Sequence, residues 1–227
     1  MPMLAPSPTR YLHHITRHIE RHIGPSPMVF HEIVSADIHL DVHIVPPVKM
    51  PPSPQHPFGR NFYTLVTSGM STRPLEGPAD GATRLMELMI SLPADWPGLR
   101  HDGTFIQEYM SHEEHWWPIR WLKMLARQPY EGGQGINIGD TVPNGATGEP
   151  FASNTTLGCM MLAPSLLHPQ AQSLVVHDDV SIEFLALWPI HVREMEFKSQ
   201  HGAEALLARL LDNRITDLLN PERAPVV

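Results

Sequence analysis

The chain has 227 residues, of which 18% are charged and 24 are proline, and its formal net charge is −8 with the histidines neutral. This length suits one domain with a single core, and the frequent prolines argue against a helical bundle. The acidic balance does not match a phosphate backbone, so nucleic-acid binding is not expected.

The N-terminal segment predicts one amphipathic helix. It can start after Thr9, a good N-cap, and run to Ile23, where Gly24 and Pro25 end it. Apolar residues recur at helical spacing on one face of this segment: Tyr11, Leu12, Ile15, Ile19 and Ile23.

Strands are predicted through the first half of the remaining chain. Residues 38–45 alternate apolar and polar side chains, whereas residues 62–67 and 85–92 are nearly continuous apolar runs. Such runs are typical of strands covered on both faces. A helix is predicted at 117–127, with Pro118 in its first turn.

The second half continues the mixture of strands and helices. After a short extended piece at 136–142, strands are predicted at 157–162, 173–176 and 180–188, the last two joined by a turn at 177–179. Residues 194–211 predict the longest helix. The fold class is therefore α+β, with a mixed β-sheet of about seven strands flanked by about three helices. Eight apolar residues are expected to be largely buried: Leu65, Leu88, Leu92, Leu122, Leu125, Leu162, Leu185 and Phe197.

Several segments, in order, resemble a known family. They are HEIVSADIHLDVHIVPP from His31, TLVTSGMSTRP from Thr64, LMELMISLPADWP from Leu85, WWPIRWLKMLARQPYE from Trp116, DTVPNG from Asp140, EPFA from Glu149 and FLALWPIHVREMEFKSQHGAEALLARL from Phe184. Together they resemble the suppressor of fused (SUFU) domain. The resemblance implies a domain at 31–221, preceded by a proline-rich segment and helix at 1–30 and followed by a tail at 222–227.

The family resemblance implies a function in protein binding. Its animal member binds Gli through a peptide that adds a strand between this domain and a second one. Gli recognition is not carried over, because the sequence ends at Val227 without that second domain. Resemblance to bacterial single-domain members implies an immunity protein that neutralises a toxin domain. A housekeeping scaffold with another protein partner is the alternative within the same class.

The sequence offers no nucleophile or cofactor motif. It has no GxSxG elbow and no dinucleotide fingerprint, and its one cysteine, Cys159, lies in an apolar run typical of a buried, inert thiol. No disulfide within the chain is possible, and neither a signal peptide nor a membrane span is evident. We therefore expect a cytoplasmic protein without catalytic residues or cofactors.

The spacing of several histidines is the strongest indication of a metal site in the sequence. His39, Asp41 and His43 share one strand face, so with a second histidine group they could serve a metal-dependent hydrolase. A buried, hydrogen-bonded pair of His39 and Asp41, reaching Thr64 or Ser68, is the favoured interpretation, and no metal is predicted. Two further patterns, His14/His18/His22 and HEEH at 112–115, are more typical of a half-buried helix flank and a charged helix entrance.

Two loops are the candidates for partner binding. The first is 132–151, where Asn144, Glu149 and Phe151 stand out; the second is 67–71, with Ser68, Gly69 and Met70. The opposing interpretation of the first loop is structural, because Pro143, Asn144 and Gly145 are also residues chosen for turn geometry.

Overall fold

The computed structural model describes residues 11–31, 38–75, 85–131, 135–177 and 180–227. In this part of the chain the elements are α1 (Leu12–His22), β1 (Met28–Phe30), β2 (Asp41–Val45), β3 (Phe62–Ser68), a 3₁₀ turn η1 (Met70–Thr72), β4 (Leu85–Pro93), a 3₁₀ turn η2 (Gln107–Ser111), α2 (Glu113–Glu131), β5 (Thr141–Pro143), β6 (Cys159–Ala163), β7 (Ser173–His177), β8 (Val180–Ile190), α3 (Val192–His201) and α4 (Ala203–Asp212).

The strands form one mixed sheet in the order β1-β2-β3-β4-β8-β6-β5. Strands β4 and β8 are parallel, and the other pairs are antiparallel. Strand β8 is long enough to pair with β7 near its start and with β6 near its end. Strands β1 and β5 therefore stand at the two ends of the sheet.

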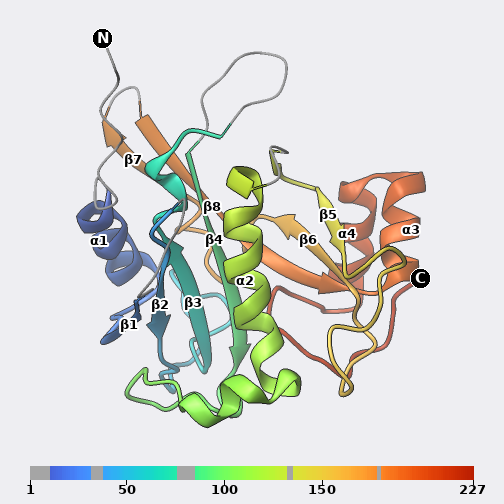
Figure 1. The fold of residues 1–227 in the computed structure, drawn as a ribbon, viewed down its shortest axis with the longest axis horizontal. Helices are drawn as coiled ribbons and strands as arrows, with labels where there is room; N and C mark the ends of the chain where they lie inside the picture. Colours follow the sequence, from blue (N-terminus) through green and yellow to red (C-terminus); the bar gives the residue numbers. More distant parts are fainter. Residues whose placement is uncertain (1–10, 32–37, 76–84, 132–134, 178–179) are drawn as a thin grey trace.

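Helices cover both faces of the sheet, which explains the continuous apolar runs. In Figure 1, α2 crosses the front of the sheet, with α1 at the left and α3 and α4 at the right. Along β8, Leu185 and Leu187 belong to the core that contains Leu122 of α2, whereas Phe184 and Ala186 belong to the second core. That second core also contains Ile15 and Ile19 of α1 and Leu206 and Leu210 of α4.

The predicted α+β class is confirmed, with local corrections. Helix α2 begins before and ends after the predicted range, and both Pro118 and Pro129 lie inside it. The single helix predicted at 194–211 is wrong, because Gly202 divides it into α3 and α4 with a φ of 91°. Strand β1 was not predicted. The Thr9 cap and two residues of the 177–179 turn lie outside the described residues.

The core prediction is correct for its seven leucines. Each of them is 3% exposed or less. Phe197 is the exception: it is half-buried, and its ring stacks on that of His201, one turn further along α3, with centroids 4.2 Å apart.

An ion pair joins the start of α3 to residues near the C-terminus. Arg223 donates from Nη1 to Oε1 of Glu194 over 2.7 Å and from Nη2 to Oε2 over 2.5 Å. The Glu194 side chain is fully buried. Burial alone would raise the pKa of Glu194, but the hydrogen bonds and charge of Arg223 lower it overall. Among the described residues, no helix is both long and apolar enough to cross a membrane.

Candidate functional site

A buried carboxylate fixes the loop that follows β3. Glu87 of β4 accepts hydrogen bonds from the Thr67 hydroxyl at 2.6 Å, the Gly69 N–H at 2.9 Å, and the N–H and hydroxyl of Ser71 at 3.0 and 2.6 Å. Burial raises the pKa of Glu87, while these hydrogen bonds act in the opposite direction. The loop is thus held from inside the protein by one acidic side chain.

The same loop is packed more deeply than the sequence indicates. Met70 is fully buried, and its carbonyl accepts a hydrogen bond from Tyr130 of α2. Ser68 is 3% exposed. Met70 is one of the candidate binding residues, and in this structure its side chain is not exposed to a partner.

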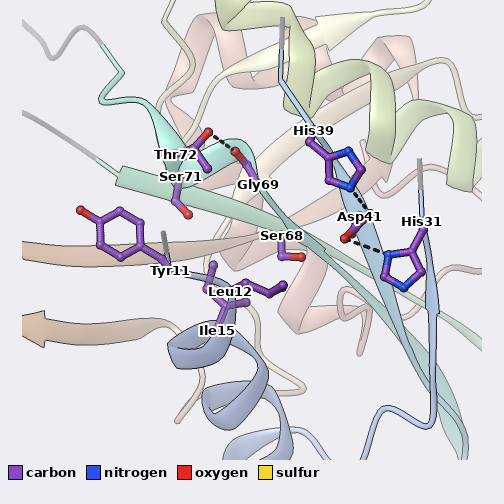
Figure 2. Close-up of a pocket in the computed structure, with 10 residues that line it drawn as sticks. All are labelled: Tyr11, Leu12, Ile15, His31, His39, Asp41, Ser68, Gly69, Ser71 and Thr72. Carbon is purple, nitrogen blue, oxygen red and sulfur yellow. Dashed lines mark hydrogen bonds and ion pairs between the residues drawn. The ribbon is translucent and has the colours of Figure 1, made fainter. Parts of the chain in front are cut away.

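One face of the loop lines a pocket of about 200 Å³. Figure 2 shows Ser68 and Gly69 on one side of it and His31, His39 and Asp41 on the other. The pairing of β2 with β3 places Asp41 directly opposite Ser68. The sequence-based expectation that the 67–71 loop lies near His39 and Asp41 matches this arrangement.

Asp41 lies between two histidines. Its Oδ1 is 3.1 Å from Nε2 of His39, and its Oδ2 is 3.1 Å from Nδ1 of His31 (Figure 2). The Asp41 side chain is only 6% exposed, against 37% for His39 and 68% for His31. His31 was not singled out from the sequence, which carries no local signal for it. It comes close to Asp41 through the antiparallel register of β1 and β2, in which Phe30 faces Val42.

His43 plays a different part from the His39–Asp41 pair. Its Nε2 is 3.1 Å from the hydroxyl oxygen of Ser68. Burial lowers the pKa of His43 to about 4, although the charge of Asp41 acts to raise it. His43 is therefore neutral at pH 7, and it supports the 67–71 loop through its contact with Ser68.

The other predicted loop is built around a polar turn. Asn144 donates from its side-chain amide to the carbonyls of Glu149 and Pro150, at 2.9 and 3.0 Å. Gly145 has a φ of 69°, which favours glycine. Phe151 is 3% exposed and stacks on Trp117 with centroids 4.7 Å apart, so Phe151 anchors the loop. Of the three residues singled out in this loop, Asn144, Glu149 and Phe151, only Glu149 has an exposed side chain.

A groove of about 470 Å³ runs beside this turn, between α2 and β5. Trp121 lies 3% exposed in its lining, and Met124 is 37% exposed at the same site. The groove also includes Val142 of β5 and Asn144. The indole N–H of Trp121 has no hydrogen-bond acceptor among the described residues.

The two other histidine patterns are structural in the described part of the chain. His18 is 3.0 Å from the carbonyl oxygen of Ala171 through Nε2, and it stacks on Phe184. Burial lowers the pKa of His18. At the entrance of α2, Glu113 pairs with Arg120. Neither pattern brings three metal-ligating side chains together among the described residues.

The family model of Suppressor of fused protein (SUFU) matches residues 36–224. The chain belongs to the SUFU family. Among curated proteins, none matches this chain. Identities to solved structures are low, so these show a shared fold. A suppressor of fused homologue from Neisseria gonorrhoeae is 18% identical with a TM-score of 0.65, over 96% of this chain and 97% of that chain.

Two further structures share the fold. A Sufu–Fu complex is 15% identical with a TM-score of 0.62, over 98% of this chain and 93% of that chain. Drosophila Suppressor of Fused is also 15% identical with a TM-score of 0.62, and 51% of that chain is covered by 98% of this one.

Proposed function

We propose that this SUFU-family chain is a non-enzymatic protein-binding domain of the immunity type, which binds and neutralises a toxin domain. Family membership supports protein binding, and one solved relative is a complex of Sufu with Fu. The observation that carries the proposal is the partly apolar groove between α2 and β5, beside an end strand of the sheet.

The occupant that this groove fits is an extended segment of the partner protein. Strand β5 pairs with β6 on one side, and its register places Val142 opposite Met160. Hydrogen bonds to β6 alternate along an antiparallel strand, so Thr141 directs its N–H and carbonyl to the other side, and Pro143 directs its carbonyl alone, because proline has no N–H. An added strand would pair there and lay apolar side chains against Met124.

The pocket beside Asp41 gives less support to a metal-dependent hydrolase. Such an enzyme needs an acid–base group next to the metal-bound water. Apart from His31, His39 and Asp41, the described residues that line the pocket include no carboxylate or histidine. They are Tyr11, Leu12, Ile15, Ser68, Gly69, Ser71 and Thr72.

A bait experiment in extract of the native host tests the groove. The Met124→Arg variant places a charge in the groove at a partly exposed position, and Leu211→Arg makes the same change at a 47% exposed position on α4. We expect the partner to bind wild type and Leu211→Arg equally and Met124→Arg at least about tenfold more weakly, since a desolvated charge opposes apolar contact. Equal binding to both variants would place the interface elsewhere.

A growth assay then tests the immunity role. Expression of the captured partner alone should arrest growth, co-expression with wild type should restore it, and Met124→Arg should protect poorly. A partner without toxicity would exclude the immunity role and leave the scaffold alternative.

Glu149→Ala and Ser68→Ala extend the comparison to the two loops singled out from the sequence. If both keep full stability and full affinity, neither loop contributes to the interface.

A further inference from the structure

Three metal-ligating side chains meet where β1 ends and β2 begins. His31 directly follows β1, and Asp41 is the first residue of β2. Because Phe30 faces Val42, the antiparallel register carries His31 to the position opposite Asp41. His39 lies two residues before Asp41, so the chain directions of two neighbouring segments bring all three side chains together (Figure 2).

The distances suit a common ion. One ligand atom from each of the three side chains lies within 4.8 Å of the others. Tetrahedral zinc with bonds of about 2.0–2.1 Å separates its ligand atoms by about 3.4 Å. The two closest separations are each 3.1 Å, but they start from different carboxylate oxygens: Oδ2 of Asp41 to Nδ1 of His31, and Oδ1 of Asp41 to Nε2 of His39. Small side-chain rotations at the partly exposed histidines can accommodate an ion.

We propose that His31, His39 and Asp41 bind a divalent transition-metal ion of the zinc class. Two imidazole nitrogens and one carboxylate favour zinc, iron or cobalt over magnesium or calcium, which prefer all-oxygen sites. Three protein ligands leave one coordination position for water, on the side of the pocket. The site is independent of the groove between α2 and β5.

The surroundings hold the carboxylate in place while the histidines remain accessible. Asp41 is nearly buried in β2 opposite Ser68, whereas His31 and His39 reach solvent. The sequence places His39, Asp41 and His43 on one strand face, but in the structure Nε2 of His43 lies 3.1 Å from the Ser68 hydroxyl oxygen and His43 is not in this cluster. His31 supplies the third ligand.

The competing explanation needs no metal, since both histidines can hydrogen-bond to Asp41. The two explanations are separated by metal titration of tag-free, chelator-stripped protein. We expect one equivalent of Zn²⁺ to bind and to raise the thermal midpoint. Co²⁺ in the same site should give visible absorption bands of a four-coordinate ion. His31→Ala and His39→Ala should each weaken Zn²⁺ binding at least about tenfold, because each removes a ligand.

A matched control removes other histidines. The double variant His14→Ala/His22→Ala removes two of the three histidines that are spaced four residues apart on α1. The single equivalent of Zn²⁺ should remain bound to this variant. Circular dichroism of His31→Ala should match wild type because His31 is largely exposed. An unchanged Zn²⁺ affinity in either His31→Ala or His39→Ala, or loss of the bound equivalent in the His14→Ala/His22→Ala variant, would overturn the proposal. So would the absence of any Zn²⁺ binding by wild type.

Discussion

Gly69 lies where the backbone after β3 passes close to the segment that carries His39. Its φ is 120°, and an added Cβ would lie 2.0 Å from the carbonyl oxygen of His39. Its N–H is one of the donors to Glu87. A single residue without a side chain therefore allows β3 to turn sharply next to the segment that carries His39.

The Gly69→Ala variant should be strongly destabilised. We expect a loss of more than about 3 kcal/mol, because backbone strain adds to a clash with a carbonyl that cannot move aside freely. Gly202→Ala is the matched control: its φ of 91° is also strained for alanine, but no atom lies within 4 Å of the added Cβ. That variant should lose about 1–2 kcal/mol. Urea unfolding measures both, and equal losses would contradict the role of the close contact.

Single residues also show where sequence-based prediction stops. His39 and Asp41 could be paired from the sequence, because alternation along a strand is a local property. His31 could not, because its approach depends on which strand lies beside β2 and in what register. Phe151 and Met70 are candidates for partner binding on the sequence, and both are buried in the structure. Their apolar character carried that information, but their position in apparent loops outweighed it.

At the scale of elements, the helix prediction failed where one glycine interrupts a good pattern. Residues 194–211 keep apolar side chains at helical spacing on both sides of Gly202, but the backbone there leaves the helical region. The cores of α1 and α2 were predictable because their apolar faces repeat without such interruption. Strand β1 is only three residues long and gives no periodic signal.

Helix α2 provides the test of the predicted core. Leu122 is fully buried against the sheet, so Leu122→Ala should lower the free energy of unfolding by about 2–5 kcal/mol, through lost burial and a residual cavity. Met124→Ala on the same helix should cost under about 1 kcal/mol, since Met124 is 37% exposed. Denaturant unfolding compares the two. A loss below about 0.5 kcal/mol for Leu122→Ala would refute its place in the core.

For the whole molecule, the order of motifs was more informative than any one of them. Seven segments spread from residue 31 to residue 210 resemble one family, and a matching family model spans residues 36–224. The strand order and the parallel pairing of β4 with β8 could not be derived, because contacts between distant strands leave no local pattern. Buried polar groups away from the His39–Asp41 pair were equally hidden, and the lowered pKa values of buried histidines make the stability of the whole protein depend on pH.

His168 has the lower pKa of the two buried histidines His43 and His168. It is 1% exposed, and its Nε2 lies 2.8 Å from the hydroxyl oxygen of Thr64. Burial lowers the pKa of His168 to about 3, and the nearby charges of His56 and Arg60 act in the same direction. The unfolded chain, with a histidine pKa of about 6.5, binds a proton that the folded protein does not. Stability should therefore fall as the pH drops below about 6.5 and continue to fall toward about 3.

The size of this effect follows from the difference between the two pKa values. Between pH 6.5 and pH 5, His168 alone should remove about 2 kcal/mol of unfolding free energy. In a His168→Gln variant, the difference in stability between pH 7 and pH 5, measured by urea unfolding, should shrink by about that amount, whatever the variant loses at pH 7. His14→Gln, at an exposed position on α1, should leave the difference unchanged. If His168→Gln keeps the full wild-type difference, a neutral buried histidine at this position is refuted.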